Sequence, residues 1–290
     1  MTKSSPDATA VPASAATAAR RSRVVLLLHG LCSSALEVRQ FARLLRAQGF
    51  VVTTLTLAGY TAPEADAAGA KTPADHRRWI ADGVREVDRL AGLHDEVTLC
   101  GVSLGATLAL AVAAERPEVV RGLSLISTTI FFDGWNVSRW RFLLPLAYWT
   151  PLGRFYRYRE TPPYGVKNPR VRAWIAAELE RGRLSSAGAS TIPTTSLREA
   201  ARLIRHVKCN LARVRTPVLM IHAREDDVAS LENVRFVARR LGTTRFREFI
   251  VADSYHMITL DNDRDHAAMK TVQFFNRAAD LSAKEPTSAA

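Results

Sequence analysis

Residues 96–117 read EVTLCGVSLGATLALAVAAERP, and this stretch indicates a strand, a tight turn and a helix in direct succession. The apolar run before the turn is typical of a buried strand, and Pro117 stands just past the end of the expected helix. The turn, GVSLG at 101–105, matches the G-x-S-x-G pattern, in which a serine occupies a sharp strand-to-helix turn. Because a strand and a helix flank it, we interpret Ser103 as a candidate nucleophile rather than a chance serine.

The rest of the chain continues the alternation of strands and helices. Short apolar runs predict strands at 24–28, 50–57, 119–126, 217–222 and 247–251. Amphipathic stretches predict helices at 35–48, 74–91, 231–241 and 265–279, the first of them with apolar Leu36, Phe41, Leu44 and Leu45. This alternation predicts an α/β fold with a mostly parallel central sheet that helices flank.

The alternation stops between residues 129 and 210, which divides the chain into a core and an insertion. A length of 290 residues fits one large domain with an insertion. We therefore predict an α/β core at 23–128 and 211–280 and an inserted helical cap at 129–210. The Ala-, Ser- and Thr-rich residues 1–22 are expected to form a disordered tail, with an organellar transit peptide as the alternative, and residues 281–290 a flexible tail.

Composition narrows the class of partner and the compartment. Apolar residues make up 47% of the chain, and no run of eighteen apolar residues predicts a transmembrane helix. The 40 Lys and Arg against 28 Asp and Glu give a charge of +12, which favours anionic partners. Because the basic residues are scattered along the chain, the alternative is that the charge only reflects a basic overall composition. No nucleic-acid-binding motif is present, so no nucleic acid is expected as a partner. Three widely spaced cysteines indicate neither a zinc site nor a disulfide framework and favour a reducing, cytoplasmic location.

A nucleophilic serine needs a base, and the base needs an orienting carboxylate. His256 is the strongest candidate base, because it follows the last predicted strand in DSYHM at 253–257. The segment HAREDDVAS at 222–230 follows another strand and offers Glu225, Asp226 and Asp227. The order Ser103, Asp226, His256 is the order of an α/β-hydrolase, and each residue follows a strand, where open α/β sheets place their sites.

Four segments carry a family resemblance: LLLHGLCSS at 26–34, LCGVSLGA at 99–106, HAREDDVA at 222–229 and DSYHMITLD at 253–261. With them the chain resembles an α/β-hydrolase of the carboxylesterase and monoacylglycerol-lipase group. The resemblance implies Asp226 as the acid, His256 as the base, and the backbone N–H groups of Leu31 and Leu104 as oxyanion donors. It implies no metal and no organic cofactor.

The chain departs from that family at two places. Many relatives carry a G-H-G-x-x-P type of loop after the second strand, whereas here the loop reads AGYTAP at 58–63. Asp227 stands where relatives often have another residue, which leaves Asp227 open as an alternative to Asp226. Of the remaining candidates, His29 is expected to shape the oxyanion loop, His222 to be structural, and Cys32 to be an apolar filler beside the site.

The predicted cap points to an apolar substrate. Residues 129–165 are dense in Phe, Trp, Tyr and Leu, with arginines interleaved. This composition predicts an apolar acyl pocket and peripheral contact with anionic lipid or a lipid head group, or alternatively aromatic residues that only pack the cap onto the sheet. The sequence thus favours a serine hydrolase of a short- or medium-chain ester or a monoglyceride. Hydrolysis of acyl thioesters on coenzyme A or a carrier protein, and a non-catalytic binding protein of this fold, remain the alternatives.

Overall fold

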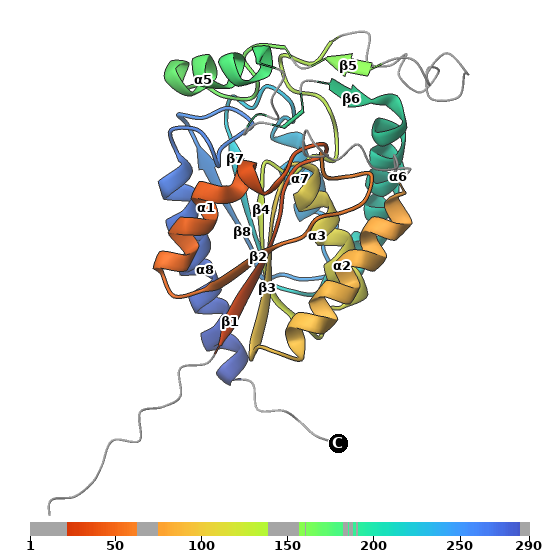
Figure 1. Ribbon diagram of the computed structural model, residues 1–290. Helices are drawn as coiled ribbons and strands as arrows, with labels where there is room; N and C mark the ends of the chain where they lie inside the picture. The colour runs from red at the N-terminus through yellow and green to blue at the C-terminus, as the bar shows by residue number, and fades with distance from the viewer. Residues whose placement is uncertain are drawn as a thin grey trace, which may run out of the picture.

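The computed structural model describes residues 22–62, 75–138, 157–159, 161–181, 185, 188–189 and 191–284. Its centre is a six-stranded sheet in the order β2-β1-β3-β4-β7-β8, in which every pairing is parallel (Figure 1). The strands are β1 (Arg23–Leu28), β2 (Val51–Thr54), β3 (Glu96–Val102), β4 (Val120–Ile126), β7 (Val218–Ala223) and β8 (Phe246–Val251). The predicted α/β fold with a parallel sheet is therefore confirmed.

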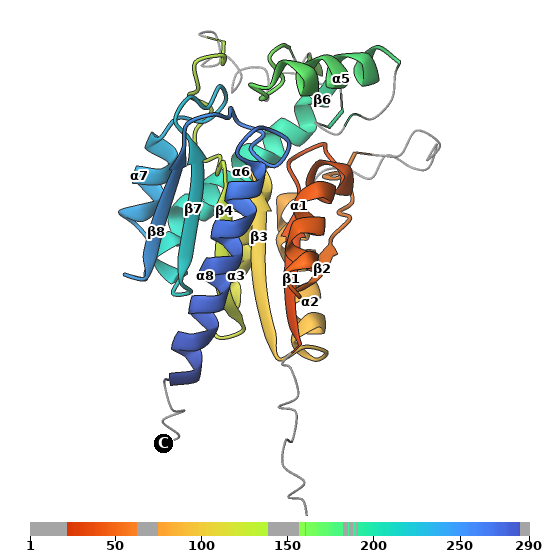
Figure 2. The same ribbon diagram turned by 90° about the vertical axis from the view of Figure 1, so that its left-hand side faces the viewer.

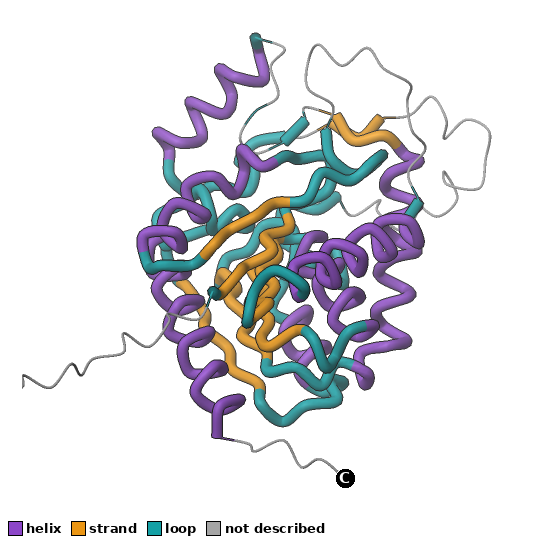
Figure 3. Tube along the Cα trace, turned by 60° about the horizontal axis from the view of Figure 1, so that its bottom comes forward, coloured by secondary structure: helices purple, strands orange, loops and turns teal. Residues whose placement is uncertain are grey.

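Helices cover both faces of this sheet (Figures 2 and 3). Successive side chains of β1 point to opposite faces, so that Val24 and Leu26 join one core cluster while Val25 and Leu27 join the other. The first cluster packs against α2 (His76–Ala91), α3 (Leu104–Glu115), α6 (Thr194–Asn210) and α7 (Glu232–Ala238), and the second against α1 (Ala35–Ala47) and α8 (Arg264–Lys284). Strands buried on both faces explain why their sequences are continuously apolar.

Helix α3 is the most deeply placed helix of the core. Its residues from Leu104 to Ala114 are all buried, because it lies between the sheet and the helices α2 and α6. An apolar sequence on every side of the helix is what such a position requires. The Ser103 turn that precedes α3 is thus held by one of the best-packed elements of the molecule.

The predicted boundaries agree with the structure except at a few ends. Strand β2 stops at Thr54 instead of residue 57, because the Leu57 carbonyl accepts hydrogen bonds from the N–H groups of Tyr60 and Thr61 and closes a turn there. Helix α8 continues to Lys284, so the first four residues of the predicted flexible tail, 281–284, are helical. In α1, Leu36 is exposed and Glu37 is buried, which corrects the helix face expected from the sequence.

The predicted insertion contains elements of two kinds. Helix α5 (Pro169–Glu180) and the antiparallel pair β5 (Arg157–Arg159) and β6 (Thr191–Pro193) lie at the carboxyl end of the sheet, as a cap would (Figure 1). Helix α6 instead lies alongside α3 and joins the larger core cluster through Ala200, Leu203, Ile204 and Val207. The predicted cap boundary at residue 210 is therefore too late, because the last helix of the insertion belongs to the helical layer of the core.

Several predicted features lie outside the described residues. These are the tail at 1–21, most of the aromatic and arginine-rich segment (139–156 and residue 160), and the last residues, 285–290. Within the described part of the chain, no helix combines the length and the apolar character needed to cross a bilayer.

Candidate active site

Ser103 lies in a strained turn between β3 and α3. Its φ of 54° and ψ of −120° fall in a region that residues other than glycine rarely adopt. The turn is held on the strand side by its N–H, which donates to the Ile126 carbonyl at 2.9 Å. A Cβ atom on either flanking glycine would lie 2.4 Å from backbone oxygens, of Gly105 for residue 101 and of Leu28 and His29 for residue 105. Both glycines of the G-x-S-x-G pattern are thus required by close backbone approach.

The structure brings Ser103, His256 and Asp226 together from the carboxyl ends of three strands. The Oγ atom of Ser103 lies 2.8 Å from Nε2 of His256. Nδ1 of the same imidazole lies 2.9 Å from each carboxylate oxygen of Asp226. Both His256 and Asp226 are almost fully buried, at 4% exposure each. This is the arrangement in which a carboxylate orients a histidine toward a serine hydroxyl.

Asp227 has a different partner from Asp226. Its Oδ1 atom accepts from the backbone N–H of His256 at 3.3 Å, whereas the imidazole ring is hydrogen-bonded to Asp226. Burial raises the pKa of Asp227. The geometry therefore favours Asp226 over the alternative that the sequence left open.

Burial and ion pairing oppose each other in the buried pair of His256 and Asp226. Burial alone would lower the pKa of His256, but the attraction to Asp226 and the hydrogen bond with it outweigh burial and raise that pKa. Burial alone would raise the pKa of Asp226, but the neighbouring imidazole brings it below the usual value. The pair thus favours an ionised carboxylate next to an imidazole that readily accepts a proton.

His222 braces the carboxylate of Asp226. Its Nε2 atom is fully buried, 2.7 Å from the carbonyl of Ala229 and 3.3 Å from Oδ2 of Asp226. The backbone N–H groups of Val228 and Ala229 also donate to Oδ1 of Asp226, at 2.9 and 2.8 Å. Burial lowers the pKa of His222, which favours its neutral form as a donor. Its predicted structural role agrees with these contacts.

The loop after β1 packs against the serine turn. The Nδ1 atom of His29 lies 2.7 Å from the Gly30 carbonyl, and its Nε2 atom lies 3.0 Å from the Thr61 hydroxyl. The Tyr60 hydroxyl donates to the His29 carbonyl at 2.9 Å, and the Cys32 N–H donates to the Tyr60 carbonyl at 2.8 Å. The AGYTAP loop, which departs from the family pattern, therefore supports the expected oxyanion loop.

The two expected oxyanion donors are neighbours of the serine turn: Leu104 follows Ser103 in the chain, and Leu31 follows Gly30, where an added Cβ atom would lie 3.7 Å from the Cβ atom of Ser103. Leu31 lies in the loop after β1, and Leu104 is the first residue of α3. Neither backbone N–H donates to another group within the described part of the chain. The first N–H groups of a helix are without intrahelical partners and attract negative charge.

A family model described as serine aminopeptidase, S33, matches residues 19–263. The chain belongs to this family. Among curated proteins, this S33 family member is 25% identical to a thermostable monoacylglycerol lipase of Bacillus sp. (strain H-257), over 88% of this chain and 91% of the relative. It is 22% identical to a carboxylesterase of Bacillus subtilis (strain 168), over 88% of this chain and 93% of that one.

The fold of the S33 family member also matches solved structures. A soluble variant of monoglyceride lipase from Saccharomyces cerevisiae, solved with a substrate analogue, has a TM-score of 0.74 at 13% identity, over 90% of this chain and 88% of that chain. At this identity the likeness shows the fold. The α/β-hydrolase fold and the relation to carboxylesterases and monoacylglycerol lipases, both predicted from the sequence, are confirmed.

A second buried carboxyl group supports the oxyanion loop of this S33 family member. Glu37 is 1% exposed, and its Oε2 atom accepts from the Gly30 N–H at 2.8 Å. Burial raises the pKa of Glu37 to about 7, against the opposing effects of the Gly30 N–H and of His256. Sequence reasoning missed this residue, although its spacing of four residues from buried Phe41 placed it on the inner face of the helix.

The raised pKa makes Glu37 a source of pH-dependent stability. Between about pH 4 and about pH 8 the unfolded chain releases the Glu37 proton before the folded protein does, so stability falls as pH rises toward 7 and then levels off. In Glu37→Gln this loss is absent, and the variant should gain about 3 kcal/mol of unfolding free energy relative to wild type across that range. Urea unfolding at several pH values measures it. Exposed Glu248→Gln on β8 is the control, and parallel curves for wild type and Glu37→Gln would contradict the assignment.

The cap is tied directly to the loop that carries His256. The Gly165 carbonyl accepts from the Met257 N–H at 2.7 Å, and a Cβ on residue 165, whose φ is +71°, would lie 2.7 Å from Met257 Cγ. Asp261 accepts from the N–H groups of Lys167 at 2.6 Å and Asn168 at 2.9 Å. It also accepts from the N–H of Tyr255 at 3.0 Å, so one carboxylate joins the cap to the histidine loop.

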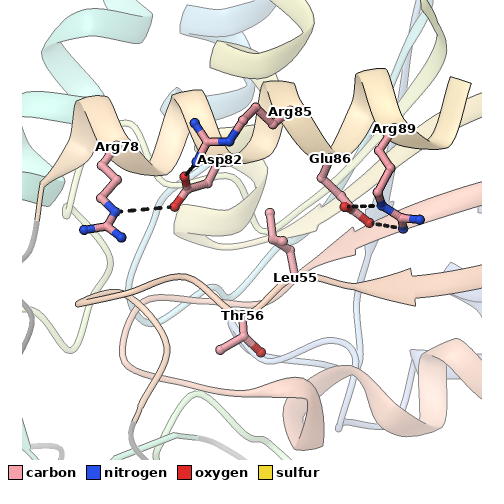
Figure 4. Close-up of a pocket in the computed structure, with 7 residues that line it drawn as sticks. All are labelled: Leu55, Thr56, Arg78, Asp82, Arg85, Glu86 and Arg89. Atoms are coloured by element: carbon pink, nitrogen blue, oxygen red, sulfur yellow. Dashed lines mark hydrogen bonds and ion pairs between the residues drawn. The ribbon is translucent and has the colours of Figure 1, made fainter. Parts of the chain in front are cut away.

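In two other polar clusters among the described residues, the charged groups pair with one another, which disfavours a bound ligand or metal ion. A surface hollow of about 360 Å³ lies between α2 and the residues after β2. The residues that line it are Leu55, Thr56, Arg78, Asp82, Arg85, Glu86 and Arg89 (Figure 4). Its arginines already pair with carboxylates of the same helix. Asp75, His76 and Glu199 have the spacing of metal ligands. Glu199 is already paired with Arg202 at 2.6 Å and with His76 at 2.8 Å, which disfavours a cation there.

Proposed function

We propose that this α/β-hydrolase cleaves carboxylic esters of apolar acyl groups, such as short- or medium-chain esters or monoglycerides. Ser103 is the nucleophile, His256 the base and Asp226 the orienting carboxylate. The observation that carries the proposal is the continuous chain of contacts from Ser103 Oγ through the His256 imidazole to Asp226, at 2.8 and 2.9 Å. The relatives support an ester as the substrate, because the two Bacillus proteins are a monoacylglycerol lipase and a carboxylesterase by name.

The reaction proceeds through an acyl-enzyme. The Ser103 oxygen attacks the acyl carbonyl carbon while its proton passes to Nε2 of His256, and Asp226 holds Nδ1–H and stabilises the imidazolium. The tetrahedral intermediate collapses, and the leaving alkoxide takes the proton from His256. Water then loses a proton to the same nitrogen, attacks the acyl carbon and releases the acid, and Ser103 recovers its proton.

Negative charge forms on the carbonyl oxygen in both halves of this reaction. The backbone N–H groups of Leu31 and Leu104 are assigned as its donors, each contributing on the order of 3 kcal/mol to transition-state stabilisation. Glu37 supports this assignment because it fixes Gly30, the residue before Leu31. No metal or organic cofactor enters any step.

Exposed aromatic side chains support two parts of the proposal, the apolar acyl group and the contact with lipid. Phe132, Trp135 and Trp174 are large apolar side chains with 39%, 58% and 44% exposure, and the ring of Trp135 packs edge-on against Tyr255, the neighbour of His256. Exposed aromatic residues of this kind are typical of proteins that meet a lipid surface. Lys167, which lies 5.8 Å from the ring of Tyr255, is already paired with Glu225 at 2.9 Å, so a preference for anionic lipid rests on the net charge of +12.

Acyl thioesters on coenzyme A or a carrier protein are the second candidate substrates, favoured by the net charge of +12. The proposal includes a reducing, cytoplasmic location, which the small number and wide spacing of the cysteines favour.

Hydrolysis of a p-nitrophenyl ester series of increasing acyl length tests the proposal. We expect kcat/KM to peak at an intermediate acyl length. Its value should exceed the kcat/KM for matched acyl-CoA thioesters and for an aminoacyl p-nitroanilide. For a monoglyceride, kcat/KM should be higher in anionic than in neutral vesicles. A higher kcat/KM on thioesters would favour the second candidate. A lack of turnover on every ester and thioester, with no labelling by a fluorophosphonate, would favour a non-catalytic binding protein.

A further inference from the structure

The candidate nucleophile has a second hydroxyl neighbour besides His256. Thr129 follows the end of β4 and is fully buried, with its Oγ1 atom 3.2 Å from Oγ of Ser103. The Ser103 oxygen therefore has two partners, the imidazole nitrogen at 2.8 Å and the Thr129 hydroxyl. In the proposed reaction only the imidazole acts on the Ser103 oxygen.

Thr129 is held firmly in this position. Its carbonyl accepts from the Thr107 hydroxyl on α3 at 2.7 Å, and its own hydroxyl lies 3.3 Å from the Ser127 carbonyl. Ser127, with φ of 49°, donates from its hydroxyl to the His256 carbonyl at 2.6 Å. Residues 127–129 thus contact both Ser103 and the loop that carries His256.

The protons at the site determine which way the bond between the two hydroxyls runs. In the resting enzyme Nδ1–H of His256 points to Asp226, so Nε2 accepts the only proton of the Ser103 hydroxyl. Thr129 must therefore be the donor in its contact with Ser103. Its alternative acceptor, the Ser127 carbonyl, is neutral, whereas the Ser103 oxygen gains negative charge as its proton leaves.

We propose that Thr129 is a further catalytic residue that donates a hydrogen bond to the Ser103 oxygen. In the resting enzyme this bond orients the hydroxyl, and during attack it stabilises the negative charge on the oxygen while the proton moves to His256. When the acyl-enzyme breaks down, the departing Ser103 oxygen accepts the same bond. Thr129 keeps its own proton throughout. This inference rests on the proposed function of Ser103 and His256.

The test compares Thr129→Val, which removes the hydroxyl at nearly constant shape, with Thr129→Ser, which keeps it. For Thr129→Val we expect kcat to fall by about 10- to 100-fold with little change in KM, as for loss of a hydrogen bond to a charged group. The rate of inactivation by a fluorophosphonate should fall by a similar factor. Thr129→Ser should stay within about threefold of wild type, because the hydroxyl is retained.

Thr98→Val is the matched control. Thr98 is a buried residue of β3 whose hydroxyl donates to the Val24 carbonyl at 3.1 Å. It lies near the start of the strand, whereas the serine turn follows the strand's end. This variant should lose stability without losing kcat. If Thr129→Val does not fold, Thr129→Ala and Thr129→Ser make the same comparison.

Two outcomes would overturn the inference while the proposed function stands. One is a folded Thr129→Val with wild-type kcat and wild-type inactivation rate. The other is a Thr129→Ser that is as slow as Thr129→Val, since packing of the methyl group would then explain the loss. Absence of ester turnover and of fluorophosphonate labelling in wild type would instead contradict the proposed function itself.

Discussion

Replacing Ser103 with alanine should lower kcat for esters by on the order of 10⁶-fold and leave the fold intact. The oxygen that attacks the substrate is removed, while the strained turn keeps its Cβ atom and its flanking glycines. Apart from the imidazole and Thr129, no described residue is hydrogen-bonded to the side chain of Ser103, so the stability cost is small. Turnover of a p-nitrophenyl ester, labelling by a fluorophosphonate and the melting temperature together measure the effect.

Ser124→Ala is the control for this loss. Ser124 is also buried, but its hydroxyl pairs with Thr271 at 2.8 Å, in the middle of β4. It should keep full turnover and full labelling. Ester turnover in Ser103→Ala above about one thousandth of wild type would disprove the assignment of Ser103 as the nucleophile. If a further Cys32→Ser substitution then removed this residual turnover, the thiol of Cys32 would be the nucleophile instead.

Asp226→Asn should lower kcat by about 10⁴-fold, whereas Asp227→Asn should lower it by less than about tenfold. An amide at position 226 presents donors to the imidazole and favours the wrong tautomer, with Nδ1 as acceptor and the proton on Nε2 facing Ser103. Without the negative charge of Asp226, burial also lowers the pKa of His256. At position 227 the amide oxygen still accepts from the His256 backbone N–H.

The neighbouring aspartates make this a matched pair. Both are nearly fully buried, at 4% and 1% exposure, so a general cost of altering a buried carboxylate would affect both variants alike. Steady-state kinetics on one ester, with melting temperatures for both variants, separates chemistry from stability. The reverse ranking would move the orienting role to Asp227.

Local patterns in the sequence were sufficient to predict the sheet, to propose Ser103 and His256, and to narrow the acid to Asp226 or Asp227. Ser103, Asp226 and His256 each lie shortly after the carboxyl end of a strand, and the carboxyl ends of parallel strands meet at one edge of a sheet. The choice of Asp226 over Asp227 needed the three-dimensional structure, because a shift of one residue turns a side chain toward a different neighbour. The end of the insertion was misplaced because the amphipathic pattern of α6 does not reveal that its apolar face packs on α3.

Glu37 and Thr129 could not be assigned from the sequence for a related reason. Thr129 is 26 residues from Ser103, and the two meet only because β3 and β4 are neighbours in the sheet. Glu37 reaches Gly30 because α1 turns its first carboxylate back toward the loop before it. The hydroxyl residues directly after β4 and the acidic residue among inward-facing apolar positions were the available signals.

The anchoring of the cap limits how the substrate range of this enzyme can be re-engineered. The insertion leaves the core at Thr129, beside the nucleophile, and is bound to the histidine loop at Gly165 and, through Asp261, at Lys167 and Asn168. The start of the insertion is also bound to the acid loop, because the Gly134 and Asn136 N–H groups donate to the Val228 and Asp227 carbonyls. A cap transplanted from a relative would replace all of these contacts and disturb the serine, the acid and the base together. Exchange of specificity therefore has to keep residues 129–136 and 165–168 from the recipient.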